Sequence, residues 1–158
     1  MNGNMQFFIK KYSEYMRDIT SLGNPIILLL ISILYLNFTR EFILVCLGIA
    51  LNEGIGSLIK ALFPKVRPNK QKYQNLLEKI DAGSFPSIHS SRISFVYLML
   101  ITNTSFIALN VILSIVIVIV GYSRIFLKKH YFIDVLGGYI MGGALFFERF
   151  LSGPEFNL

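Results

Sequence analysis

Long apolar runs dominate this sequence, and their lengths limit the folds that the chain can adopt. Residues 106–122 contain no charged side chain and are rich in Ile and Val. Such a run matches the roughly 17–25 residues that a helix needs to cross a membrane. Ile and Val favour strands in water, but in lipid a single run satisfies its backbone hydrogen bonds only as a helix. With 54% hydrophobic and 15% charged residues, the chain is also too apolar for an ordinary soluble domain. We therefore predict an all-α integral membrane protein.

Polar turns divide the apolar sequence into about five transmembrane helices. Asn24-Pro25 begins the first of them, because proline is tolerated in the first turn of a helix. The last contains Gly137-Gly138 and Gly142-Gly143, a spacing of small residues that permits close helix packing. We expect a single membrane domain over residues 1–158, with spans at about 22–38, 42–62, 86–102, 106–123 and 131–150.

The segment before the first span has a different pattern. Apolar side chains recur at helical spacing between residues 5 and 20, and charged side chains occupy the other face. This pattern predicts an amphipathic helix that lies at the membrane interface. The alternative is a helix that covers one side of the bundle.

The charge of the chain indicates what it binds. The formal net charge is +6, which implies an anionic partner, either a phosphate group or membrane lipid headgroups. Nucleic acid is a poor alternative, because the basic residues punctuate membrane spans. Cys46 is the only cysteine, so neither an intrachain disulfide nor a multi-cysteine metal site can form.

Five spans would place most polar residues of interest on one side of the membrane. That side receives the N-terminal helix, the 63–85 loop, the start of the third span and the 123–131 turn. All lysines and arginines except Arg40 and Arg149 fall there, as do both histidines. The candidate site consists of Lys60, Arg67, Ser87, His89, Arg124, His130 and Asp134.

These residue types suit phosphate chemistry. Asp134 follows His130 by four residues, so within one helix the two would share a face. A carboxylate so placed fixes the tautomer of an imidazole. Arg124 offers a planar fork for phosphate oxygens. Pro86-Ser87-Ile88-His89 opens a helix, whose N-terminus directs backbone N–H groups at an anion.

Four further residues allow two interpretations each. Glu53 is a carboxyl group at membrane depth, either a partner of the site or a structural hydrogen-bond acceptor. Arg92, one turn after His89, is either an extra phosphate contact or an anchor that reaches the interface. Lys128 and Lys129 are expected to be solvated anchors rather than catalytic groups.

Together the motifs resemble those of the type 2 phosphatidic acid phosphatase superfamily, which also includes vanadium haloperoxidases. The family pattern is K-x6-R-P, then P-S-G-H, then S-R-x5-H-x3-D. This chain has Lys60 with Arg67-Pro68, then Pro86 to His89, then Ser123-Arg124 with His130 and Asp134. The first and third motifs match at every defining position, and in the second Ile88 replaces the family glycine.

The resemblance implies a role for each matching residue. His130 would attack phosphorus and form a phosphohistidine, Asp134 would hold His130, and His89 would protonate the leaving oxygen and then activate water. The phosphate oxygens would be bound by Lys60, Arg67, Ser87, the Ile88 N–H and Arg124. No metal or other cofactor is expected, because three cations neutralise the phosphate.

The resemblance also implies a substrate class. We expect a membrane lipid phosphatase, with a polyprenyl pyrophosphate as the first choice. The alternative substrates are phosphatidic acid and phosphatidylglycerol phosphate. A non-catalytic lipid-phosphate binder or transporter is an alternative of another class, favoured only by Ile88. The excess of Lys and Arg places the site on the cytoplasmic face, whereas the family resemblance favours the extracytoplasmic face. The sequence does not reveal the oligomeric state.

Overall fold

The computed structural model describes residues 3–36 and 40–151, and these residues are helical and connected by loops. The loops include one isolated antiparallel bridge between Val66 and Gly83. The helices are α1 (Gly3–Ser21), α2 (Pro25–Leu36), α3 (Arg40–Leu62), α4 (Leu76–Asp81), α5 (Ile88–Thr102), α6 (Ile107–Phe126) and α7 (Phe132–Leu151). The prediction of an all-α fold is confirmed for the described residues.

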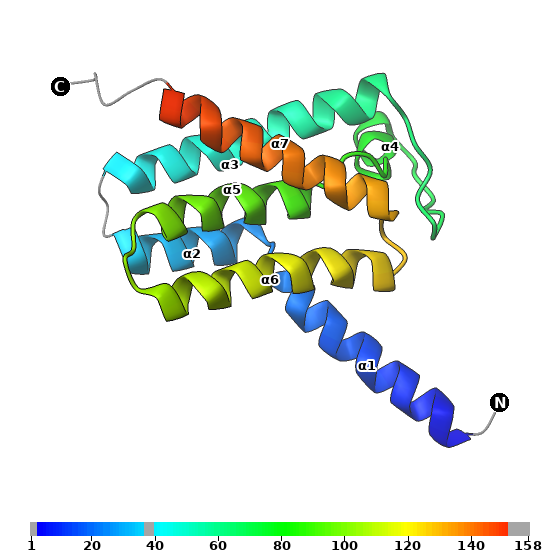
Figure 1. Ribbon diagram of the computed structural model, residues 1–158. Coiled ribbons are helices and arrows are strands. Elements are labelled where there is room, and N and C mark those ends of the chain that lie inside the picture. The colour runs from blue at the N-terminus through cyan, green and yellow to red at the C-terminus, as the bar shows by residue number, and fades with distance from the viewer. Residues whose placement is uncertain (1–2, 37–39, 152–158) are drawn as a thin grey trace.

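Helices α2, α3, α5, α6 and α7 lie side by side in one bundle, and α5 is at its centre (Figure 1). Helix α5 packs against α2, α3, α6 and α7. It is buried on almost every side, although its first turns carry several serines. These small side chains let the surrounding helices approach α5 closely.

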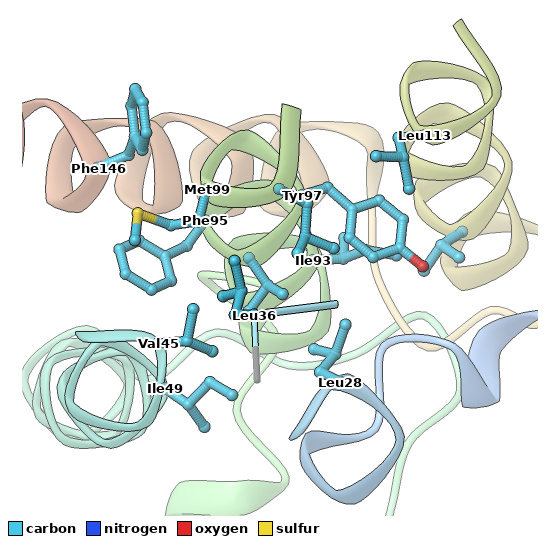
Figure 2. Packing of buried hydrophobic residues seen from close by; sticks show 13 residues of the cluster. Leu28, Leu36, Val45, Ile49, Ile93, Phe95, Tyr97, Met99, Leu113 and Phe146 are labelled. Atoms are coloured by element: carbon cyan, nitrogen blue, oxygen red, sulfur yellow. The ribbon is translucent and has the colours of Figure 1, made fainter. Parts of the chain in front are cut away.

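The apolar core surrounds the second half of α5. Ile93, Phe95 and Met99 of α5 meet Leu28 of α2 and Val45 of α3 in a continuous cluster (Figure 2). This burial of apolar side chains holds the bundle together at the end away from the candidate site, and it leaves the first turn of α5 for polar contacts.

Two glycines allow α7 to pack directly on the backbone of α5. A Cβ atom at Gly138 would lie 2.4 Å from the carbonyl oxygen of Ser87, and one at Gly142 would lie 2.2 Å from that of Ser91. No side chain fits in this space. The prediction that the small residues of the last span permit close packing is confirmed.

The outer surface of the bundle is apolar, as expected of a protein in lipid. Helix α6 exposes large side chains along its length, including Ile112, Ile115 and Val118. By length and hydropathy α3 and α6 can each cross a membrane, and the bent pair α1–α2 adds a third crossing if it counts as one span. The chain is thus a helical membrane protein, but the predicted number of five spans is not confirmed. Helix α2, with 12 residues, is only about 18 Å long, whereas the hydrocarbon core is about 30 Å thick.

Helix α1 leaves the bundle at an angle (Figure 1). Its axis is bent by 56° from that of α2. Its second half packs on α6, where Tyr12 stacks edge-on against Phe126 with ring centroids 4.9 Å apart. Its first half exposes Phe7 and Phe8. The helix therefore covers part of the bundle, and its location at the membrane interface stays a prediction.

The long loop after α3 folds over one end of the bundle. It contains the short helix α4, which Asn75 caps by accepting a hydrogen bond from the Glu78 N–H at 2.8 Å. The Val66–Gly83 bridge closes the base of the loop. The predicted 63–85 loop is thus a compact structure that brings Arg67 back to the bundle.

Candidate active site

The polar residues gather around one cavity at the end of the bundle that carries α4. The cavity has a volume of about 290 Å³ and lies between the last turn of α3, the first turn of α5 and the turn after α6. Its walls are formed by Glu53, Lys60, Arg67, Gln71, Asp81, Ile88, His89, Arg92, Arg124, Lys129 and His130. Most residues predicted from the sequence are among them. Ser87 and Asp134 are not, and both side chains are fully buried behind the wall.

His130 is positioned by the turn that ends α6. Lys128 adopts a left-handed conformation (φ 53°), and its N–H donates to the Ile125 carbonyl at 2.9 Å. The N–H groups of Lys129 and His130 both donate to the Arg124 carbonyl, at 3.0 and 3.2 Å. This is a Schellman motif, which reverses the chain and satisfies the last carbonyls of a helix. It brings the His130 ring back beside Arg124.

The tautomer of His130 follows from its hydrogen bonds. Its Nδ1 atom lies 2.7 Å from the carbonyl oxygen of Ser84. A carbonyl can only accept, so Nδ1 carries the proton and Nε2 has the lone pair. Nε2 lies 3.5 Å from Nη2 of Arg124. The nitrogen with the lone pair therefore lies on the side of the cavity that holds a cation.

The expectation that Asp134 holds His130 is wrong in this structure. Helix α7 begins at Phe132, after His130, so the two residues do not share a helix face. Asp134 instead accepts from the Tyr131 N–H (2.8 Å), the Ser84 hydroxyl (2.5 Å) and the Lys65 ammonium group (2.6 Å). It caps the first turn of α7 and fixes the loop residue whose carbonyl holds His130.

His130 is neutral in this environment. Its side chain is only 2% exposed. Burial lowers the pKa of His130 to about 3, and the positive charges of Arg124 and Arg67 act in the same direction, whereas the hydrogen bond to Ser84 opposes them. A neutral imidazole keeps its lone pair across the physiological range, as a nucleophile requires.

His89 is held from the other side by Arg92. Nη2 of Arg92 lies 3.2 Å from Nδ1 of His89, and Nη1 of the same guanidinium pairs with Glu53. Arginine can only donate, so Nδ1 of the neutral ring accepts and Nε2 carries the proton. Arg92 is almost fully buried, and so the interpretation as an interface anchor does not fit. Glu53 is its partner.

The arginines are fixed by carbonyl and hydroxyl oxygens. Arg67 donates to the Asp81 carbonyl at 2.5 Å and to the side-chain oxygen of Gln71 at 2.8 Å. Burial is the main cause that lowers the pKa of Arg67. Arg124 donates to the Thr20 hydroxyl of α1 at 3.1 Å. The guanidinium groups of Arg67, Arg92 and Arg124 are thus all oriented by neighbouring residues before any ligand binds.

Two of these guanidinium groups retain an unsatisfied donor. Among the described residues, the Nε atoms of Arg92 and Arg124 are buried without a hydrogen-bond partner. Buried N–H groups are rarely left unpaired in proteins, because each costs about 1–3 kcal/mol. Both residues line the same cavity. The arrangement therefore suits an anion with several acceptor oxygens.

Ile88 replaces the family glycine without a strained backbone. Gly56 of α3 lies opposite Ile88, and a Cβ atom at Gly56 would come within 2.7 Å of the Ile88 side chain. The isoleucine therefore occupies space that a glycine on the neighbouring helix provides. The Ser87 hydroxyl oxygen caps α5 and accepts from the Ser90 hydroxyl at 2.9 Å behind the cavity wall, and its role in binding phosphate stays a prediction.

Sequence reasoning missed several residues around the site. Lys65 pairs with Asp134, Thr20 binds Arg124, and Ser84 holds His130. Lys129 lines the cavity instead of being a solvated anchor, whereas Lys128 is exposed as expected. Lys65 lies within the first motif, but no spacing rule distinguishes it from the other lysines of the loop.

The chain matches a known protein family and a known protein. The family model of the PAP2 superfamily matches residues 41–156. Phosphatidylglycerophosphatase B of Bacillus subtilis (strain 168) is 29% identical in an alignment of 150 residues, and the match covers 85% of this chain and 72% of that protein.

A solved structure has the same fold. It is the crystal structure described as the first transmembrane PAP2 type phosphatidylglycerolphosphate phosphatase from Bacillus subtilis, with a TM-score of 0.68 and 24% sequence identity. The similarity covers 93% of this chain and 80% of that one. The family match, which spans most of the chain, shows that this protein belongs to the PAP2 superfamily and is a membrane lipid phosphatase.

Proposed function

We propose that the protein hydrolyses the phosphomonoester of phosphatidylglycerol phosphate through a phosphohistidine on His130. The observation that carries the proposal is the group of four buried cations, Lys60, Arg67, Arg92 and Arg124, around a cavity that also contains both histidines. Such a cluster is costly unless an anion compensates it. The similarity to a phosphatidylglycerophosphatase favours this substrate over the polyprenyl pyrophosphate expected from the sequence.

The size of the cavity is consistent with a headgroup phosphate. Its volume of about 290 Å³ lies near the lower end of the roughly 300–1,000 Å³ found for small-molecule sites. Among the described residues that form its walls, only Ile88 has an apolar side chain. The acyl chains of a lipid substrate would therefore remain outside the cavity, against the apolar surface of the helices.

In the first half of the reaction, the lone pair on Nε2 of His130 attacks phosphorus. In the substrate complex a proton on Nδ1 of His89 replaces the hydrogen bond from Arg92, which keeps Glu53 as a partner, so the ring is cationic. The bond between phosphorus and the ester oxygen breaks, and Nε2 of His89 donates its proton to the leaving oxygen. The proton on Nδ1 of His130 remains in its bond to Ser84, so the phosphorylated ring is cationic. Lys60, Arg67 and Arg124 stabilise the charge on the phosphoryl oxygens.

In the second half, a water molecule attacks the phosphohistidine. Neutral His89 takes a proton from this water, the bond between nitrogen and phosphorus breaks, and Nε2 recovers its lone pair. Inorganic phosphate leaves, and His89 is again protonated. The proton from water returns to Nε2 of His89, the same nitrogen that donated to the leaving oxygen.

The test is phosphate release by the purified protein in detergent with EDTA present. Phosphatidylglycerol phosphate, phosphatidic acid and a polyprenyl pyrophosphate are compared, each with and without vanadate. We expect the fastest release from phosphatidylglycerol phosphate, inhibition by vanadate and loss of activity in His130→Asn. Faster release from the pyrophosphate would overturn the substrate assignment, and folded protein that hydrolyses none of the three would overturn the enzymatic function.

The membrane face of the site needs a separate experiment. The distribution of Lys and Arg favours the cytoplasm, and the family resemblance favours the opposite face. After Cys46→Ser, a cysteine introduced between Lys70 and Lys79 reports the location of the loop by its reaction with an impermeant thiol reagent. Labelling of intact cells places the site outside, and labelling only after lysis places it in the cytoplasm.

A further inference from the structure

We propose that Lys65 and Ser84 are positioning residues for the nucleophile, and that Asp134 acts on His130 only through them. The inference rests on the proposed function, in which His130 attacks phosphorus. It concerns a hydrogen-bond network behind the cavity wall that connects a loop lysine, a loop serine and the first turn of α7.

The network begins at the backbone of Ser84. Its carbonyl oxygen accepts from Nδ1 of His130 at 2.7 Å, and its N–H donates to the carbonyl of Lys65 at 2.7 Å. The adjacent Gly83 forms the bridge with Val66. The residue whose carbonyl orients His130 is therefore paired with Lys65 beside an isolated antiparallel bridge, and the direction of the carbonyl depends on this pairing.

Asp134 joins the side chains of the same two residues. One carboxylate oxygen accepts from the Ser84 hydroxyl at 2.5 Å, and the other lies 2.6 Å from the Lys65 ammonium nitrogen. Asp134 is fully buried, so its charge requires these partners. Lys65 also lies 4.9 Å from the ring centroid of Tyr131, which restricts its ammonium group further.

The result is a closed loop of contacts. Lys65 and Ser84 are joined once through their backbones and once through Asp134. Ser84 cannot move without breaking one of these bonds, and its carbonyl holds the ring of His130. The network thus determines where Nε2 of His130 points. The Ser84 carbonyl alone determines which ring nitrogen of His130 carries the proton.

This division of roles predicts a specific difference from a carboxylate–histidine pair. Where a carboxylate itself binds the imidazole, its replacement by an amide changes the tautomer and lowers the rate by about 10⁴-fold. Here Asp134→Asn should leave the proton of His130 on Nδ1. The rate should fall only by between about 10- and 100-fold, as expected from a displaced nucleophile.

The experiment uses ¹⁵N-labelled histidine in the full chain. With only two histidines, His89→Gln assigns the signals. The ¹⁵N spectra report which ring nitrogen of His130 is protonated in the wild type, Ser84→Ala and Asp134→Asn. The double variant Lys65→Gln with Asp134→Asn tests the network when Asp134→Asn alone destabilises the fold, because Gln supplies an acceptor for the new amide.

Ser32→Ala is the matched control, since Ser32 is an equally buried serine that bonds Leu28 within α2. We expect Ser84→Ala to lower kcat by between about 10- and 100-fold with KM little changed, and Ser32→Ala to leave both unchanged. A change of His130 to the Nε2-protonated tautomer in Asp134→Asn would overturn the proposal, as would full activity in Ser84→Ala. If the wild type hydrolyses no lipid phosphate, the proposed function fails, and the spectra still decide the positioning.

Discussion

Gly142 lies so close to Ser91 that a methyl group on the glycine would come within 2.2 Å of the serine's carbonyl oxygen. This contact joins α7 to the central helix. At the adjacent Gly143, an added methyl group would meet nothing within 4 Å. The two neighbouring glycines therefore provide a direct test of how α5 and α7 pack.

We predict that Gly142→Ala destabilises the protein by about 1–3 kcal/mol, the usual range for overpacking. Gly143→Ala should be neutral or slightly stabilising, because Ala is a better helix former than Gly. Thermal unfolding of both variants in detergent checks this prediction. Equal midpoints for the two variants would show that the helices are not in backbone contact.

The second prediction concerns the left-handed residue in the turn before His130. Lys128 has a φ of 53°, a conformation that costs a non-glycine residue about 1–2 kcal/mol. Lys128→Gly should therefore raise the free energy of unfolding by up to about 1 kcal/mol, after the entropy of glycine in the unfolded chain is subtracted. Activity should not change, since the Lys128 side chain points to solvent. Lys128→Ala, which keeps the strain, is the control, and a gain in that variant would contradict the explanation.

The third prediction concerns the effect of pH on stability. The pKa of His130 is about 3 in the folded state and about 6.5 in the unfolded chain. As pH falls below 6.5, the unfolded state takes up a proton that the folded state does not, so stability is lost. Between pH 8 and pH 5.5 the loss is about 1.4 kcal/mol.

His130→Asn removes this contribution and keeps a donor for the Ser84 carbonyl. The stability of the wild type relative to His130→Asn should therefore decrease by about 1.4 kcal/mol between pH 8 and 5.5. Denaturant titrations in phosphate-free buffer measure this difference, because a bound anion would change the pKa. A difference that stays constant over this range would mean that His130 is not buried as a neutral ring.

The fourth prediction connects α1 to the site. The Thr20 hydroxyl accepts from Arg124 at 3.1 Å, which fixes a cation that would bind the phosphoryl group. Thr20→Val keeps the shape of the side chain and removes the acceptor. We expect kcat/KM to fall by about 10-fold, the lower part of the range for a hydrogen bond to a charged group.

Ser13→Ala provides the comparison for this variant. Ser13 is a half-buried residue of α1 whose hydroxyl donates to the Ile9 carbonyl within the same helix. Its truncation should leave kcat/KM unchanged. Equal effects of the two substitutions would indicate that α1 acts as a whole and not through the bond to Arg124.

Periodicity and spacing predicted the parts of the fold that depend on local sequence. The Asn24-Pro25 start of a helix, the small-residue face of α7 and the convergence of both histidines are examples. The first two features follow from rules that act within a few residues of the sequence. The convergence of the histidines follows from the order of the spans. The convergence of Lys60, Arg67 and Arg124 follows from the same order.

Contacts between distant segments could not be predicted in this way. The link between His130 and Asp134 was inferred from a spacing of four, but the helix begins after His130, so the rule did not apply. The bonds of Ser84 and Lys65 depend on how the 63–87 loop folds, which no periodicity describes. The sequence also does not indicate that α5 is the central helix, because its many serines make it less apolar than α6.

Ile88 and Gly56 carry a consequence for how such sequences are compared. The Ile88 side chain fills the space between α3 and α5 that a side chain at position 56 would need, so a large residue at one position requires a small residue at the other. In related chains with glycine at position 88, we expect position 56 to accept larger residues. The side-chain volumes at positions 56 and 88 should vary inversely during evolution. The motif glycine at position 88 can then be replaced by isoleucine wherever position 56 of the opposite helix is a small residue.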